Sequence, residues 1–131
     1  MAKVRAMLSD KEAIATVAVK DLRTAAAFYE DKLGLEVQAR EGDQVIAYRT
    51  GTTRLNVYVS QFAGTNQATA VTWPVGGDLE AIVRALKGKG VVFEHYAMPG
   101  LEREGDIHHG GGLRLAWFKD PDGNIFNLAS R

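Results

Sequence analysis

The chain has 131 residues, of which 46% are hydrophobic and 24% are charged, and its 16 Lys and Arg residues balance 16 Asp and Glu residues. This composition is typical of one soluble globular domain, and a neutral chain lacks the basic face that nucleic acid or an anionic membrane requires. The absence of cysteine excludes disulfides, a thiolate nucleophile and Cys metal sites. No apolar run reaches the roughly 20 residues of a spanning helix, and residues 1–13 are too polar for a secretory signal, so we expect a cytoplasmic protein.

The first predicted strand lies within residues 14–19, and a helix follows it. Residues 1–12 are polar and read as an N-terminal arm. Asp21 is suited to cap the helix, because its carboxylate can accept bonds from the free N–H groups of the first turn. One apolar stripe follows at helical spacing: Leu22, Ala25, Ala26, Tyr29 and Leu33. Gly34 can take the left-handed conformation that ends a helix.

Three more strands are predicted, at residues 35–39, 45–49 and 54–59. The last of these alternates, with Leu55, Val57 and Val59 on one face and Arg54, Asn56 and Tyr58 on the other. An Asn and a Tyr on the second face suit a binding surface as well as water. The polar residues 60–69 are predicted to connect two halves of the chain.

The same pattern returns in the second half. Residues 71–75 are strand-like, Asp78 is a predicted cap, and an apolar helical stripe follows at Leu79, Ile82, Val83 and Leu86. Strands are predicted at 91–96, 113–118 and 125–129, and residues 97–112 form a long loop without a clear element. Each half therefore reads β-α-β-β-β. We predict a single α+β domain over residues 1–131, with one module at about 13–60 and another at about 69–130.

Four short motifs occur in a characteristic order: D-L at the start of each helix, F-Y at Phe28 and Tyr29, L-G-L at 33–35, and F-K-D-P-D-G-N at 118–124. In this order they resemble the vicinal oxygen chelate superfamily, which includes glyoxalase I, bleomycin resistance proteins, fosfomycin resistance enzymes and extradiol dioxygenases. The resemblance implies two modules that form a curled mixed sheet around a concave cavity. It also implies a homodimer.

Metal-binding members of that superfamily hold a divalent ion through one residue from each of four strands. The resemblance places these positions at Ile14, Asn56, Ala70 and Asn127. Two hydrocarbons and two neutral amides are a poor donor set, because a hard divalent cation normally needs carboxylate or imidazole ligands. We therefore expect no inherited metal site and no cofactor.

Other chemistry is conceivable in the 97–112 loop. Asp106 and His108 share a side if the loop is extended, so the carboxylate could orient the imidazole for acid–base catalysis, while His109 points the other way. In the dioxygenases, a histidine just before the penultimate strand helps to bind the substrate, and the resemblance places His108 at a similar position. Trp117, however, stands where those enzymes carry a tyrosine. Asp106, His108 and His109 are thus the catalytic candidates. A new metal site made of His95, His108 and an acid such as Asp106 or Glu104 is an alternative.

The remaining reading is a small-molecule pocket with apolar and aromatic walls and a few amide anchors. Its expected ligand-binding residues are Tyr48, Asn56, Tyr58, His108, Trp117 and Asn127. We expect a metal-free protein that binds an apolar or planar organic ligand. The alternative is a metal-dependent lyase, isomerase or dioxygenase that uses the loop histidines.

Overall fold

The computed structural model describes residues 7–131, and the first six residues of the expected N-terminal arm lie outside the described residues. The first half consists, in chain order, of β1 (Ala15–Val19), α1 (Leu22–Ala26), a π-helical continuation (Ala27–Lys32), β2 (Glu36–Glu41), β3 (Val45–Thr50) and β4 (Thr53–Val59). The strands form one sheet in the order β1-β4-β3-β2, in which only the β1–β4 pair is parallel.

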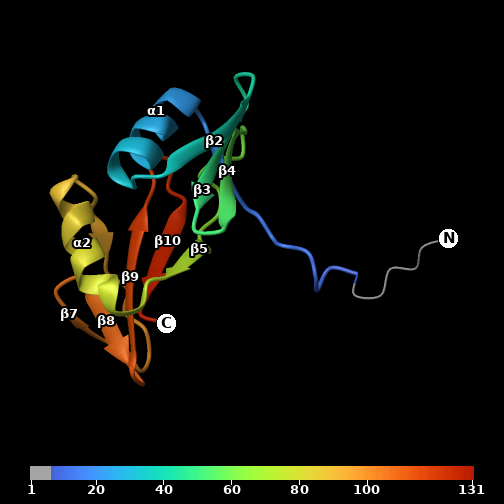
Figure 1. Cartoon of the computed structure of the whole chain (residues 1–131). Coiled ribbons are helices and arrows are strands. Elements are labelled where there is room, and N and C mark those ends of the chain that lie inside the picture. The colour runs from blue at the N-terminus through green and yellow to red at the C-terminus, as the bar shows by residue number, and fades with distance from the viewer. Residues whose placement is uncertain (1–6) are drawn as a thin grey trace.

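The second half repeats this arrangement with additions. It consists of β5 (Thr69–Pro74), a 3-10 turn (Gly76–Asp78), α2 (Leu79–Gly88), β6 (Phe93–Glu94), β7 (Glu102–Glu104), β8 (Ile107–Gly110), β9 (Leu113–Lys119) and β10 (Ile125–Ala129). The sheet order is β5-β10-β9-β8-β7, β6 also pairs with β9, and β5 is parallel to β10. The expected α+β fold with two curled mixed sheets is confirmed (Figure 1).

The expectation that residues 97–112 carry no regular element is wrong. Strands β7 and β8 form a hairpin within this segment, and β8 adds to the edge of β9. Gly105 makes the tight turn between them at φ 61°, a conformation that glycine adopts without a Cβ clash. The strands are only three and four residues long, which is why an alternation signal was absent.

Local sequence explains one helix start but not the other. Asp21 caps α1 as expected, because its carboxylate accepts bonds from the Thr24 backbone N–H and hydroxyl, both at 2.9 Å. Asp78 makes no such side-chain bond, since it lies in a 3-10 turn that leads into α2. Asp78 therefore occupies the predicted N-cap position of α2, but its side chain does not cap the helix.

Both helices cover the same side of the two sheets, as Figure 1 shows. Alternate strand residues point toward the helices and form one core cluster with them, including Val17, Leu55, Phe118, Phe126 and Leu128. Burial of this continuous apolar layer is the main stabilising contribution to the fold. The opposite side of each sheet carries no helix, and we call it the helix-free face.

A buried polar network joins the two halves of the chain. The Tyr29 hydroxyl on the first helix donates to the Asp120 carboxylate at 2.6 Å, from the turn between β9 and β10. Asn124 donates to the Ala18 carbonyl of β1 at 2.8 Å and to Asp120 at 2.7 Å. Burial and the negative charge of Asp120 raise the pKa of Tyr29, so its hydroxyl remains a donor. Two of the sequence motifs thus serve one structural contact.

Candidate functional site

The structure corrects the expected position of Tyr48. This side chain is fully buried on the helix-covered side, stacked on Tyr29 with ring centroids 5.8 Å apart. Its hydroxyl donates to Glu30 at 2.8 Å, and burial raises its pKa. Tyr48 belongs to the core with Leu55, its partner on β4, so it does not face a ligand on the helix-free face.

Asn56 and Tyr58 lie on the helix-free face of the first sheet. Leu55 and Val57 alternate with them and are fully buried in the core, which confirms the predicted alternation of β4. Tyr58 is 38% exposed in the described chain. The first sheet therefore presents an aromatic ring and an amide to its surroundings.

The second sheet brings together three other expected ligand-binding residues. Trp117 and Asn127 face each other across β9 and β10. The His108 imidazole packs edge-on against the indole, with ring centroids 4.9 Å apart. The three side chains are only 1–7% exposed, so this part of the helix-free face is covered within the chain.

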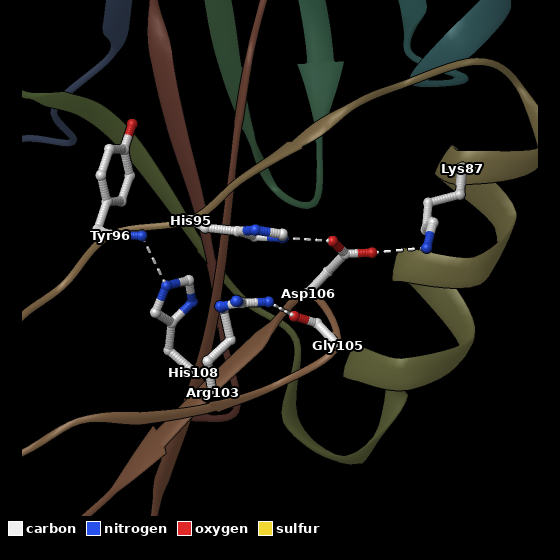
Figure 2. A network of polar contacts seen from close by, with 7 residues as sticks. All are labelled: Lys87, His95, Tyr96, Arg103, Gly105, Asp106 and His108. Carbon is white, nitrogen blue, oxygen red and sulfur yellow. Dashed lines mark hydrogen bonds and ion pairs between the residues drawn. The ribbon is translucent and has the colours of Figure 1, made fainter.

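Tyr96 provides part of that cover, although the sequence did not single it out. Its ring lies 5.4 Å from the Trp117 ring and 6.4 Å from the His108 ring, measured between centroids. Its hydroxyl points away from His108 (Figure 2) and has no hydrogen-bond partner among the described residues. The alternation in residues 91–96 could have placed Tyr96 on this face. Glu94 pairs with Trp117, and Tyr96 lies two residues after Glu94, so both point to the same side of the strand.

His108 is held as a neutral imidazole. Burial lowers its pKa, and the nearby charges of His95 and Arg103 act in the same direction. The Tyr96 backbone N–H donates to Nε2 at 2.9 Å, which places the ring proton on Nδ1. Nδ1 is buried and makes no well-formed hydrogen bond among residues 7–131, although the nearby Leu115 backbone opposes the lowering of the pKa. A neutral imidazole with a free N–H can bind an acceptor group of a ligand.

The expected pairing of Asp106 with His108 is wrong. Asp106 bonds instead to His95 Nε2 at 2.8 Å and to Lys87 Nζ of α2 at 2.6 Å, as Figure 2 shows. The Lys87 and His95 contacts hold the pKa of the Asp106 carboxyl below its usual range. Because β8 directs His108 to the helix-free face, the turn that precedes it carries Asp106 toward α2.

His109 points away from His108, as expected for successive strand residues. It pairs across the strands with Glu102 and Arg114. It borders two open hollows of about 420 and 510 Å³ at the edge of the second sheet. His109 and His108 therefore lie on different faces and do not act on one bound molecule.

The four inherited metal positions offer a poor set of donor atoms. Ile14 and Ala70 offer no donor atom, and the Asn127 amide is buried and donates to the Ala116 carbonyl at 3.2 Å. Within the described part of the chain, no group of three or more His, Asp or Glu side chains is arranged to hold an ion. The residues present do not fit the divalent ion that metal-binding members of the fold carry.

Acidification is expected to destabilise the fold through His108. Because its folded pKa lies below the ordinary 6.5, the unfolded chain binds more protons between that folded value and 6.5. The contribution of His108 to the free energy of unfolding is therefore fully present above pH 6.5. It is lost as the pH drops from 6.5 through the folded pKa. His108→Gln should flatten the dependence of the urea midpoint on pH between 7 and 5, whereas His109→Gln should leave it unchanged. An equal slope in wild type and His108→Gln would contradict the assignment.

Comparisons with known proteins agree with this geometry. Residues 13–128 match the family model "Glyoxalase/Bleomycin resistance protein/Dioxygenase superfamily". The chain belongs to this superfamily, and the resemblance drawn from its motifs is confirmed. Among curated proteins, none matches the sequence. No helix in residues 7–131 is long and apolar enough to span a membrane.

Three solved structures illustrate the similarity. "Oxidase ChaP-H2" is 27% identical, with a TM-score of 0.68 and coverage of 95% of both chains. Lactoylglutathione lyase from Agrobacterium tumefaciens is 17% identical, with a TM-score of 0.69 and coverage of 93% of this chain and 94% of that one. A bleomycin resistance determinant encoded on the transposon Tn5 is 21% identical, with a TM-score of 0.66 and coverage of 92% and 98%. The last two show the fold alone.

Proposed function

We propose that this chain is a small-molecule-binding member of the superfamily that works without the inherited metal site. The observation that carries the proposal is the donor set at the four family positions, where Ile14 and Ala70 are hydrocarbons and Asn56 and Asn127 are neutral amides. Such a site does not compensate a divalent ion for the loss of its water shell. A protein of this fold with these four residues keeps the sheet surface on which a ligand can bind. It lacks the metal ion that would act as a Lewis acid.

The ligand class follows from the helix-free face of the second sheet. Trp117, His108 and Tyr96 supply three rings, and their contacts favour a planar ligand that stacks or packs edge-on. The free Nδ1–H of His108 suits an uncharged acceptor such as a carbonyl or ether oxygen. Trp117 is 7% exposed and packs against Tyr96 and His108, so a ligand that contacts the indole displaces side chains that cover it.

The proposal includes a cytoplasmic homodimer. Asn56 and Tyr58 face away from the helices, and Tyr58 is 38% exposed, so a second copy placed on this face would bury an aromatic ring and an amide. Sedimentation equilibrium tests this part of the proposal. Tyr58→Glu should raise the dissociation constant of the dimer, and a monomeric wild-type protein would contradict it.

A thermal-shift screen of planar, uncharged aromatic compounds tests ligand binding. At least one compound should stabilise the wild type. Trp117→Ala should raise the dissociation constant of that compound by about tenfold, the loss expected for one aromatic contact. His109→Ala, on the other face, should bind within twofold of wild type. Trp117→Phe provides a second variant if Trp117→Ala does not fold. The proposal would be contradicted if no compound in the library stabilised the wild type, or if Trp117→Ala and His109→Ala lost the same affinity for the compound.

An enzyme is the second candidate, and the likeness to "Oxidase ChaP-H2" at 27% identity favours it. In this reading a metal-dependent lyase, isomerase or dioxygenase, or a metal-free acid–base enzyme, uses the histidines near β8. His95, Asp106 and His108 are the available groups, although His108 makes no bond to Asp106 in the described structure. Elemental analysis of the purified protein separates the metal-dependent enzyme from the metal-free alternatives, because a stoichiometric divalent metal lost on His108→Ala would replace the metal-free proposal. A bell-shaped pH dependence of turnover, abolished by mutating one histidine, would indicate the acid–base enzyme.

A further inference from the structure

An apolar hollow lies on the helix-covered side, where the two halves of the chain meet. Its volume is about 220 Å³. The walls come from the end of the first helix, β3, β5, α2, β9 and β10. The lining residues are Leu33, Leu35, Thr50, Trp73, Val75, Ile82, Leu86, Phe118 and Leu128. This hollow is distinct from the proposed ligand face, because Phe118 and Leu128 point to the opposite side of their strands from Trp117 and Asn127.

The wall side chains carry two polar groups, and these bond to each other. The Trp73 indole N–H donates to the Thr50 hydroxyl at 2.9 Å, and the other seven lining side chains are hydrocarbon. An ordered water needs two to four polar partners, which these side chains do not offer. A charged or strongly polar molecule would lose its hydration without compensation. The chemistry of the walls therefore selects an uncharged hydrocarbon-like occupant.

The size of the hollow agrees with a small aromatic molecule. An engineered, enclosed cavity of about 150 Å³ with Leu, Ile and Phe walls binds benzene and xenon; this hollow of about 220 Å³ is open on one side and has room for a substituted single ring. Trp73 and Phe118 are stacked with centroids 6.4 Å apart and give the hollow an aromatic wall. Leu33, Leu35, Val75 and Ile82 pack against the core but stay partly exposed, so their remaining apolar surface is open to an occupant.

We propose that this hollow is a second binding site, for a small uncharged aromatic or aliphatic hydrocarbon. The occupant contacts Trp73 and lies across the sheet from Trp117. Its binding stabilises the junction between the halves, because both helices and both sheets contribute walls. This site does not depend on the ligand or the metal content of the helix-free face.

The two tryptophans of the chain make the test specific, since each reports on one face. Toluene and xenon serve as probes. In Trp117→Phe, Trp73 is the sole tryptophan, and its fluorescence should change on titration with toluene as in wild type. In Trp73→Phe, a response of Trp117 reports toluene on the helix-free face, so the Trp73 response in Trp117→Phe carries the test. The reverse pattern, a response of Trp117 alone, would overturn the proposal by placing the probe on the helix-free face.

Filling the hollow provides the second arm. Near-saturating toluene should raise the melting temperature of wild type by roughly 2–5 °C. Ile82→Phe should abolish this shift, whereas Ala85→Phe, on the exposed side of the same helix, should retain it. Sedimentation equilibrium on both variants tests whether a second copy of the chain, rather than a small molecule, occupies the hollow. A change of oligomeric state in Ile82→Phe alone, with no toluene shift in wild type, would make the hollow an interface with a second copy and overturn the proposal.

Discussion

Replacing Asp120 with alanine is expected to lower the free energy of unfolding by about 3–5 kcal/mol, because several buried donors lose their acceptor at once. The Asp120 carboxylate accepts from the Tyr29 hydroxyl at 2.6 Å, from Asn124 N–H at 2.8 Å and from the Asn124 amide at 2.7 Å. Asp120 is 5% exposed, so water does not readily replace it. Urea unfolding monitored by circular dichroism measures the loss.

Asp122→Ala is the matched control in the same turn. Among residues 7–131 its carboxylate accepts one longer bond, from Lys20 N–H at 3.3 Å, and the expected loss is below about 1 kcal/mol. Tyr29→Phe completes a double-mutant cycle with Asp120→Ala, and the two losses should be less than additive because the residues share one bond. Equal losses for Asp120→Ala and Asp122→Ala would mean that the polar network between the halves does not contribute as described.

The second large effect is expected for Gly110→Ala, at about 1–3 kcal/mol of lost stability. A Cβ at Gly110 would overlap the Gly100 carbonyl oxygen and approach Leu101 Cδ2 at 3.0 Å. The Gly100 oxygen belongs to the backbone, so the whole segment before β7 must move away from β8. This segment continues from Tyr96, and its displacement should also expose Trp117.

Two measurements check the effect of Gly110→Ala. The urea midpoint should fall, and in a Trp73→Phe background the Trp117 emission should become more accessible to acrylamide. Gly88→Ala is the control, because a Cβ there meets no atom within 4 Å and its φ lies outside the positive range. This control should be neutral or slightly stabilising, since alanine favours a helix over glycine. Unchanged acrylamide quenching in Gly110→Ala would contradict the covering role of the segment.

Local sequence patterns predicted most of the fold. The alternation of Leu55, Asn56 and Val57 and the cap at Asp21 each follow from contacts a few residues apart, and the structure confirms both. The β7–β8 hairpin was missed because its strands are too short for a period-2 signal, and it is held by pairing with β9. Asp78 lies at the predicted N-cap position, but the 3-10 turn of residues 76–78 leaves its side chain without a capping bond.

The candidate site was only partly predictable. Trp117, Asn127 and His108 were expected on one surface and do lie together, because their strand parity fixes the face. Tyr48 was misplaced, since its residue type suits both a ligand wall and the core, and only the pairing with Leu55 and the contact with Glu30 decide between them. The partner of Asp106 depends on where α2 packs, which no spacing within the loop reveals.

The amino-acid sequence by itself determined the two β-α-β halves, the alternating strand faces and the residue types at the inherited metal positions. These properties depend on local periodicity and on side-chain chemistry, which can be read in order along the chain. Only the tertiary structure decided that Tyr96 covers His108, that Asp106 joins Lys87, and that Trp73 borders an apolar hollow between the halves. Each of these contacts joins different elements of the chain, and its geometry follows from how sheets and helices pack.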